Sequence, residues 1–150
     1  MTHAAIAEGN TAVITGGAAG IGLATAIRLA GTGLNVCIAD LGTDRLDAAA
    51  AAIAQVSPRG RDAVMAAESD VSRFEDMAKL SEQVAARFGA TDILMNNAGI
   101  QPGSEMFGPP ENWSRVIGVN LWGVINGTHA FVPQMIARRK PGLVINTGSK

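Results

Sequence analysis

The sequence TGGAAGIG, Thr15–Gly22, joins an apolar stretch of strand length, Thr11–Thr15, to a segment with helical periodicity. Glycine is needed where the backbone adopts positive φ or approaches a ligand closely, and a helix N-terminus presents unpaired N–H groups and a partial positive charge. This combination predicts a strand, a turn and a helix whose first turn can receive a pyrophosphate. The glycine cluster alone is equally compatible with a tight turn that binds nothing. It is not a P-loop, because no Lys-Ser or Lys-Thr pair follows Gly22 and the spacing is G-x-x-x-G-x-G.

Asp40 supports the ligand-binding interpretation, because it directly follows the next apolar stretch, Asn35–Ala39. An acidic side chain about 20 residues beyond such glycines can accept hydrogen bonds from an adenosine ribose. Its carboxylate would repel a ribose 2′-phosphate, and neither Ala19 nor Leu41 supplies a compensating cation. The sequence therefore favours NAD over NADP, while Asp40 taken alone could be a solvated turn acid.

Strand-length apolar runs alternate with helix-periodic stretches along the chain. Runs such as AVIT, VCIA, DILM and LVIN are almost wholly apolar, as expected for strands that are covered on both faces. The alternation predicts an α/β fold, a doubly wound parallel sheet with helices on both faces. The expected strands are Thr11–Thr15, Asn35–Ala39, Asp62–Ala67, Asp92–Met95 and Leu143–Thr147, and the expected helices are Gly20–Ala30, Thr43–Gln55, Arg73–Phe88 and Glu111–Arg139.

The third helix has the clearest boundary signals. Ser72 and Glu75 have the S-x-x-E spacing of a capping box, and Gly89 follows the helix as a C-terminal stop. Pro133 is expected to kink the last helix. The irregular segment Gln101–Asn112 is the loop most suspected of function. The expected apolar stripe of the third helix is Phe74, Met77, Val84 and Phe88.

The composition restricts the class of protein and its partners. The 150 residues, of which 47% are hydrophobic, suit one globular domain. The formal net charge is -1 and basic residues are dispersed apart from 138–140, which favours a small-molecule partner over nucleic acid. The single cysteine, Cys37, lies in an expected buried strand and fits a reducing, cytoplasmic setting. No export signal and no apolar run of roughly 18 residues is present, so no membrane association is expected.

Short motifs in a characteristic order cover nearly the whole chain. They are TGGAAGIG at 15–22, DV at 70–71, NNAG at 96–99 and VIGVNLWG around Asn120, followed by Ser149 in GLVINTGS. On these motifs the chain resembles the short-chain dehydrogenase/reductase family of classical type. The resemblance implies a Rossmann-like fold with strand order 3-2-1-4-5. It also implies an oxidoreductase that transfers a hydride between NAD and a secondary alcohol or ketone.

The resemblance further implies which residues contact the cofactor. These residues lie at or just beyond the carboxyl ends of the expected strands, where open α/β sheets bind their ligands. Taken singly, Asp70 could instead cap a helix, and NNAG has an ordinary turn composition. Asn96 is expected to tie strands together. The expected contacts are Gly16, Ala19, Gly20, Ile21 and Gly22 with the pyrophosphate, Asp40 and Leu41 with the ribose, Asp70 and Val71 with the adenine, and Asn97, Ala98 and Gly99 with the cofactor beyond the fourth strand.

Ser149 and Asn120 are the catalytic candidates that the resemblance implies, and no residue is assigned to a metal. A serine hydroxyl at a strand end can hydrogen-bond a substrate carbonyl, and a helical asparagine can hold a water or backbone group in a proton relay. The family also uses a Tyr-x-x-x-Lys pair, because a phenol with a pKa of about 10 is a poor base until a cation stabilises its phenolate. The sequence contains no tyrosine, and Lys150 is not that lysine. His3 and His129 are expected to be structural or solvated.

Three interpretations of the whole chain remain open. In the favoured one, residues 1–150 form a single NAD(P)-binding domain that lacks the C-terminal strands and helices of the family, and the tyrosine and lysine come later in a parent enzyme. In the second, the chain is a non-catalytic NAD-binding or regulatory module that ends at Lys150. In the third, it is a structural fragment that binds nothing by itself.

Trp113 and Trp122 lie among apolar residues that indicate core or subunit contact, and the resemblance makes a homo-oligomer the expectation.

Overall fold

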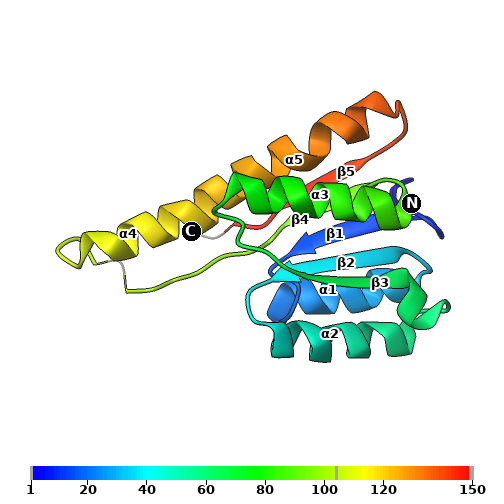
Figure 1. Cartoon of the computed structure of the whole chain (residues 1–150), viewed down its shortest axis with the longest axis horizontal. Helices are drawn as coiled ribbons and strands as arrows, with labels where there is room; N and C mark the ends of the chain where they lie inside the picture. The colour runs from blue at the N-terminus through cyan, green and yellow to red at the C-terminus, as the bar shows by residue number, and fades with distance from the viewer. Residues whose placement is uncertain (1, 104, 149–150) are drawn as a thin grey trace.

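The computed structural model, which describes residues 2–103 and 105–148, contains a five-stranded sheet in the order β3-β2-β1-β4-β5 (Figure 1). Every strand pair is parallel, which confirms the predicted fold class and strand order. The strands are β1 Thr11–Thr15, β2 Asn35–Asp40, β3 Val64–Glu68, β4 Ile93–Asn96 and β5 Leu143–Asn146. The helices are α1 Gly20–Gly31, α2 Thr43–Val56, α3 Phe74–Phe88, α4 Pro110–Ile117 and α5 Gly123–Ala137, with a short 3₁₀ helix at Gly60–Ala63.

Helices cover both faces of the sheet. Helices α1 and α2 lie on one face, and α3 and α5 lie on the other (Figure 1). Successive strand residues point to opposite faces, so Ile14 of β1 packs in the cluster that contains Ile53 of α2, while Val13 packs in the cluster that contains Phe131 of α5. Each such buried side chain stabilises the fold by about 1.5–3 kcal/mol relative to leaving it exposed. The sheet is thereby sandwiched between two apolar layers.

The strand register brings the carboxyl ends of neighbouring strands to the same edge of the sheet. Thr15 at the end of β1 pairs with Ala39 of β2, and Ile14 pairs with Met95 of β4. The segments that leave β1, β2 and β4 therefore begin side by side. In open α/β sheets this is the edge at which ligands bind.

The start of α3 differs from the prediction, and the Ser72–Glu75 capping box is wrong. Arg73 is the residue that precedes the helix, and no side chain caps it. The backbone N–H and the hydroxyl of Ser72 both donate to Asp70 Oδ1, at 2.9 and 2.7 Å. A nearby aspartate commonly competes with the backbone for such donors. Met77 and Val84 of the predicted apolar stripe are buried, together with Leu80 and Ser81, whereas Phe74 is 47% exposed and Phe88 is only partly buried.

The stretch predicted as one helix, Glu111–Arg139, is divided. Helix α4 ends at Ile117, a π-helical segment occupies Gly118–Trp122, and α5 continues through Pro133 to Ala137. A π-helical turn holds an extra residue per turn and therefore shifts which side chains face the sheet. Such turns are frequent near functional sites. Asn120 lies within this one.

Candidate functional site

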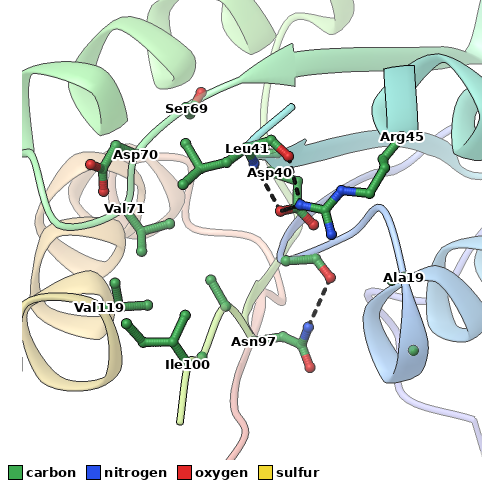
Figure 2. Close-up of a pocket in the computed structure, with 15 residues that line it drawn as sticks. Ala19, Asp40, Leu41, Arg45, Ser69, Asp70, Val71, Asn97, Ile100 and Val119 are labelled. Atoms are coloured by element: carbon green, nitrogen blue, oxygen red, sulfur yellow. Dashed lines mark hydrogen bonds and ion pairs between the residues drawn. The ribbon is translucent and has the colours of Figure 1, made fainter. Parts of the chain in front are cut away.

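A cavity of about 390 Å³ opens at the carboxyl edge of the sheet (Figure 2). Segments that follow β1, β2, β3 and β4 form its walls, together with the π-helical segment. Its volume lies within the range of sites for small molecules and cofactors. The residues that line it are Gly16, Ala19, Gly20, Ala39, Asp40, Leu41, Arg45, Ser69, Asp70, Val71, Asn97, Ala98, Gly99, Ile100 and Val119.

The glycine turn, residues 15–22, packs tightly against the end of β4. Gly16 has φ of 63°, and a Cβ on it would lie 2.8 Å from Ala98 Cα. A Cβ on Gly22 would collide with the carbonyl oxygen of Gly16 and would lie 2.7 Å from Asn97 Nδ2. A side chain at either position would therefore push the turn away from β4. Glycine is required at both positions because neighbouring backbone atoms and Asn97 leave no room for a Cβ.

Asn97 holds the glycine turn in place. Its side-chain Nδ2 donates to the carbonyl oxygens of Thr15, at 3.0 Å, and Gly16, at 3.2 Å. The hydroxyl of Thr15 in turn accepts the backbone N–H groups of Asn97 and Ala98, at 3.0 and 3.1 Å. Asn97 thus lines the cavity, while its amide nitrogen is committed to the backbone of β1 and the turn.

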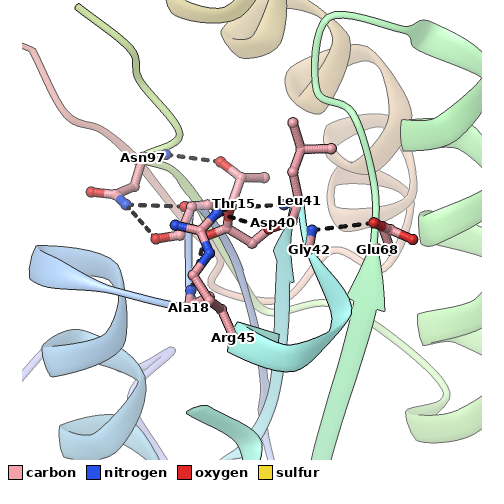
Figure 3. Close-up of polar contacts among 9 residues, drawn as sticks. Thr15, Ala18, Asp40, Leu41, Gly42, Arg45, Glu68 and Asn97 are labelled. Carbon is pink, nitrogen blue, oxygen red and sulfur yellow. Dashed lines mark hydrogen bonds and ion pairs between the residues drawn. The ribbon is translucent and has the colours of Figure 1, made fainter. Parts of the chain in front are cut away.

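Asp40 lies at the rim of the cavity with its carboxylate held by backbone donors (Figure 3). Oδ2 accepts the N–H of Ala18 at 3.0 Å, and Oδ1 accepts the N–H of Leu41 at 2.8 Å. An ionised carboxylate offers about four lone-pair sites, so two remain for other donors. The two backbone donors thus fix the orientation of the carboxylate, which can still accept hydrogen bonds from ribose hydroxyls.

Arg45 is a cavity residue that the sequence analysis missed. Its guanidinium nitrogen Nη2 lies 3.8 Å from Asp40 Oδ1 and donates to the carbonyl oxygen of Leu41 at 2.9 Å. The expectation that no cation offsets Asp40 rested on its sequence neighbour Leu41 and on Ala19 in the glycine turn, neither of which is charged. Side chains in a helix tilt toward its N-terminus, so a residue in the first turn of α2 can reach back to the end of β2. This position of Arg45 in the first turn of the expected helix was the signal in the sequence that could have indicated a cation near Asp40.

Asp70 and Val71 form the wall beyond β3. The N–H of Asp70 donates to Asp76 Oδ2 at 3.2 Å, and its own carboxylate is occupied by Ser72. The carbonyl of Val71 accepts a hydrogen bond of 2.9 Å from Asn126 Nδ2 of α5. This wall is therefore positioned from α3 and α5, which lie on the same face of the sheet.

Asn120 binds the backbone of the loop that follows β4. Its Oδ1 accepts the N–H of Ile100 and its Nδ2 donates to the carbonyl of Ile100, both at 2.9 Å. Both polar atoms of the side chain are thereby occupied, which fits the backbone-holding alternative for this residue. Ser149, the other catalytic candidate, lies outside the described residues.

Most of the predicted contact residues come together in this cavity, but Ile21 and Gly22 do not line it. Ile21 is 68% exposed at the start of α1, and Gly22 is buried behind the turn. Asn96 ties β4 to β5 as expected, because its Nδ2 donates to Asn146 Oδ1 at 2.9 Å. Beyond Arg45, the lining residues that the sequence analysis missed are Ala39, Ser69, Ile100 and Val119.

The cavity has the features that a dinucleotide requires. Helix α1 begins after Ala19, no side chain of the described residues caps it, and its first turn contains no acidic residue. Its first N–H groups therefore remain available to an anion, supported by the helix dipole. Asp40 supplies a hydrogen-bond acceptor in the same cavity, beside the glycine turn, because its Oδ2 accepts the N–H of Ala18. A phosphate site next to a ribose acceptor fits the diphosphate and the adjoining ribose of an adenosine diphosphate group.

Residues 10–150 match the family described as short chain dehydrogenase. The chain belongs to the short-chain dehydrogenase family. Within it, the chain is 36% identical to 3beta-hydroxysteroid dehydrogenase 2 of Eggerthella lenta over 151 residues, which covers 98% of this chain and 56% of that enzyme. The chain spans about half the length of this and several other curated relatives.

Solved structures of short-chain dehydrogenases have the same fold. An enzyme of this family from Burkholderia phymatum, in complex with NAD, matches with a TM-score of 0.88 at 29% identity, over 95% of this chain and 50% of that one. A metagenomic short-chain oxidoreductase in complex with NADP matches with a TM-score of 0.87 at 31% identity, over 97% of this chain and 64% of that one. Both nicotinamide cofactors therefore occur among its relatives.

Residues 2–103 and 105–148, the described parts of the chain, lack two further kinds of feature. None of the helices there has the length and apolar character to cross a membrane. No group of three or more His, Cys, Asp or Glu side chains in those ranges is arranged to hold a metal ion.

Proposed function

We propose that this chain is the cofactor-binding portion of an NAD-dependent oxidoreductase that transfers a hydride between the nicotinamide and a secondary alcohol or ketone. The observation that carries the proposal is the cavity in which the glycine turn, the uncapped start of α1 and the carboxylate of Asp40 meet. Bound NAD would supply the hydride acceptor. The residues of the chain would hold the cofactor and orient its adenosine end.

The preference for NAD rests on Asp40. Its carboxylate is fixed by Ala18 and Leu41 and faces the cavity, where it can accept ribose hydroxyls. A 2′-phosphate would bring negative charge beside that carboxylate, and the repulsion is strong at short range. NAD avoids this cost because its ribose carries a hydroxyl at that position.

The catalytic part of the proposal combines residues of this chain with a later segment. Asn120 would fix the backbone at Ile100 beside the reacting groups, and Ser149 would hydrogen-bond the substrate oxygen. The tyrosine and lysine would follow Lys150 in the parent protein. Support comes from relatives that are about twice as long as the matched region.

The chain is also proposed to assemble as a homo-oligomer in a reducing, cytoplasmic setting. The oligomer is supported by large apolar side chains of α4 and the π-helical segment that are partly exposed. The setting is supported by Cys37, a free and fully buried thiol whose pKa burial raises to about 12. A protonated, inaccessible thiol is a small core hydrophobe rather than a disulfide partner.

Replacing Asp40 with arginine in the full-length protein tests the cofactor assignment. The ratio of NAD affinity to NADP affinity should fall about 100-fold, because a charge-assisted hydrogen bond is lost and a repulsion becomes an attraction. Isothermal titration calorimetry measures both affinities, and reduction of the nicotinamide in the presence of secondary alcohols measures turnover. Asp47→Arg, an exposed position on α2 that does not line the cavity, is the matched control for charge.

The outcomes separate the candidate functions. An unchanged ratio in Asp40→Arg would contradict the role assigned to that carboxylate. Binding of NAD without turnover of any alcohol or ketone would favour the non-catalytic module. Absence of binding by the folded protein would contradict the cofactor-binding proposal as a whole.

A further inference from the structure

Arg45 places a positive charge at the ribose end of the cavity, next to the carboxylate that was expected to exclude NADP (Figure 3). Among the described residues that line the cavity, it is the one basic side chain, beside the acidic Asp40 and Asp70. Its guanidinium lies on the same side of the cavity as Asp40 (Figure 2). The local charge is therefore a pair rather than an isolated carboxylate.

The guanidinium is available to a ligand. The Arg45 side chain is 63% exposed, and one hydrogen bond from its Nη2 holds it to the carbonyl oxygen of Leu41. Of its five N–H donors, most remain free. Its separation of 3.8 Å from Asp40 in an exposed setting makes the ion pair weak and easily exchanged. A planar guanidinium can bind a phosphate through paired hydrogen bonds, as it can a carboxylate.

Other charges at this end limit how strong the effect can be. Glu68 Oε1 accepts the N–H of Gly42 at 3.1 Å, so a second carboxylate lies near the same turn. Asp44 lies in the first turn of α2 beside Arg45. Both oppose a phosphate, so Arg45 can reduce the discrimination set by Asp40 but cannot reverse it.

We propose that Arg45 determines how strongly the cavity discriminates between NAD and NADP. Its guanidinium can leave Asp40 and bind a ribose 2′-phosphate instead. The proposal rests on the proposed function, in which this cavity binds a nicotinamide dinucleotide. NAD remains preferred, because Asp40 lines the cavity and its carboxylate can accept hydrogen bonds from a ribose that carries no phosphate. NADP is nevertheless bound, because Arg45 offsets part of the repulsion between the phosphate and Asp40.

The experiment uses two ligands that differ only in the 2′-phosphate, AMP and 2′,5′-ADP, and the full-length protein. Their affinities are measured by calorimetry for the wild type, Arg45→Gln and Arg45→Lys. In Arg45→Gln the affinity of 2′,5′-ADP relative to AMP should fall about tenfold, the loss expected for one charge-assisted contact. Arg45→Lys should retain part of the wild-type ratio, because it keeps the charge and loses the paired geometry.

Arg73→Gln is the matched control. Arg73 forms a comparable exposed ion pair, with its Nε 3.9 Å from Asp76 Oδ1, but it does not line the cavity. The wild-type ratio should persist in this variant. A fall equal to that of Arg45→Gln would show a general charge effect and would overturn the proposal.

The remaining outcomes distinguish the role of Arg45 from the proposed binding of a nicotinamide dinucleotide. If AMP binds but the ratio is the same in Arg45→Gln and the wild type, the role of Arg45 is overturned and the cofactor cavity stands. If the wild type binds neither AMP nor 2′,5′-ADP, the proposed function and the role of Arg45 are both overturned. Raising the ionic strength should also reduce the wild-type ratio, because contacts between exposed charges are screened.

Discussion

The glycine-turn region, residues 11–42, and the helix region, residues 110–146, are built in different ways. In the first, every residue of β1 is buried, because β2 and β4 flank it and helices cover both faces. In the second, α4 has no buried residue and the residues of β5 alternate between half-buried and exposed. Large apolar side chains remain partly exposed there, namely Trp113, Ile117, Leu121 and Trp122.

The contrast shows which part of the chain is complete by itself. In the glycine-turn region the strands β1 and β2 are buried by neighbouring elements of the same chain, and the exposed large apolar side chains, Ile21 and Leu41, lie beside the cavity segments rather than in the strands. The apolar side chains of the helix region are the kind of surface that proteins cover with another polypeptide surface. The adenosine end of the cavity is therefore expected to tolerate isolation better than the helix region.

The polar contacts differ in the same way. In the glycine-turn region, backbone N–H groups and Asn97 fix Asp40 and the turn at the ends of adjacent strands. In the helix region, Asn126 and Asn120 reach across to hold backbone groups of the opposite walls. Changes in the first region should therefore have larger effects on folding and binding than changes in the second.

Gly22→Ala should have the largest effect, because the added methyl group would collide with the Gly16 carbonyl and crowd Asn97. We expect a loss of about 3 kcal/mol in the free energy of unfolding and of measurable AMP binding. Chemical denaturation and calorimetry measure the two quantities. In the control Gly31→Ala the added Cβ would lie 3.9 Å from the Val56 carbonyl oxygen, and stability should rise by about 0.5 kcal/mol. Wild-type stability in Gly22→Ala would show that the turn can relax.

Asn126→Leu should have an intermediate effect on the opposite wall. It removes the donor to the buried Val71 carbonyl, which should cost about 1–3 kcal/mol of stability. AMP should bind about tenfold more weakly, which corresponds to a loss of about 1.4 kcal/mol in binding free energy. Binding of nicotinamide mononucleotide, which lacks the adenine expected at this wall, reports any general loss of structure.

Asn112→Leu provides the control for that variant. Asn112 Nδ2 donates to the carbonyl of Gly103 at 2.7 Å, but this hydrogen bond is exposed and remote from Val71. Stability should change by no more than about 0.5 kcal/mol. Equal losses of AMP affinity in both variants would contradict a specific link between Asn126 and the cavity.

Leu121→Gln should have the smallest effect on folding and a clear effect on assembly. Leu121 is 54% exposed, so its replacement should change the free energy of unfolding by about 0.5 kcal/mol or less. Sedimentation should show a smaller species than the wild type, because an apolar contact of the proposed interface is lost. Val56→Gln, at a 43% exposed position on α2, should leave the assembly unchanged. An unchanged mass in Leu121→Gln would place any interface elsewhere.

The sequence allowed the architecture and the place of the cavity to be predicted because both depend on short-range patterns. Apolar runs identified the strands, and Asp40 was placed at the cavity rim because it directly follows one of them. The capping box failed for an equally local reason, since Asp70 competes for the hydroxyl of Ser72. The π-helical segment was missed because the apolar pattern around Asn120 is also that of an ordinary helix.

By itself, then, the sequence determined the alternation of strands and helices, the glycine turn and the acidic residue after β2. Steric and periodic rules that act over a few residues are sufficient for these features. The tertiary structure alone decided that Arg45 lies beside Asp40 and that Asn126, 55 residues along the chain from Val71, holds the cavity wall. Such contacts depend on how α2 and α5 pack against the sheet, and side chains can interact across the cavity only after that packing has placed them.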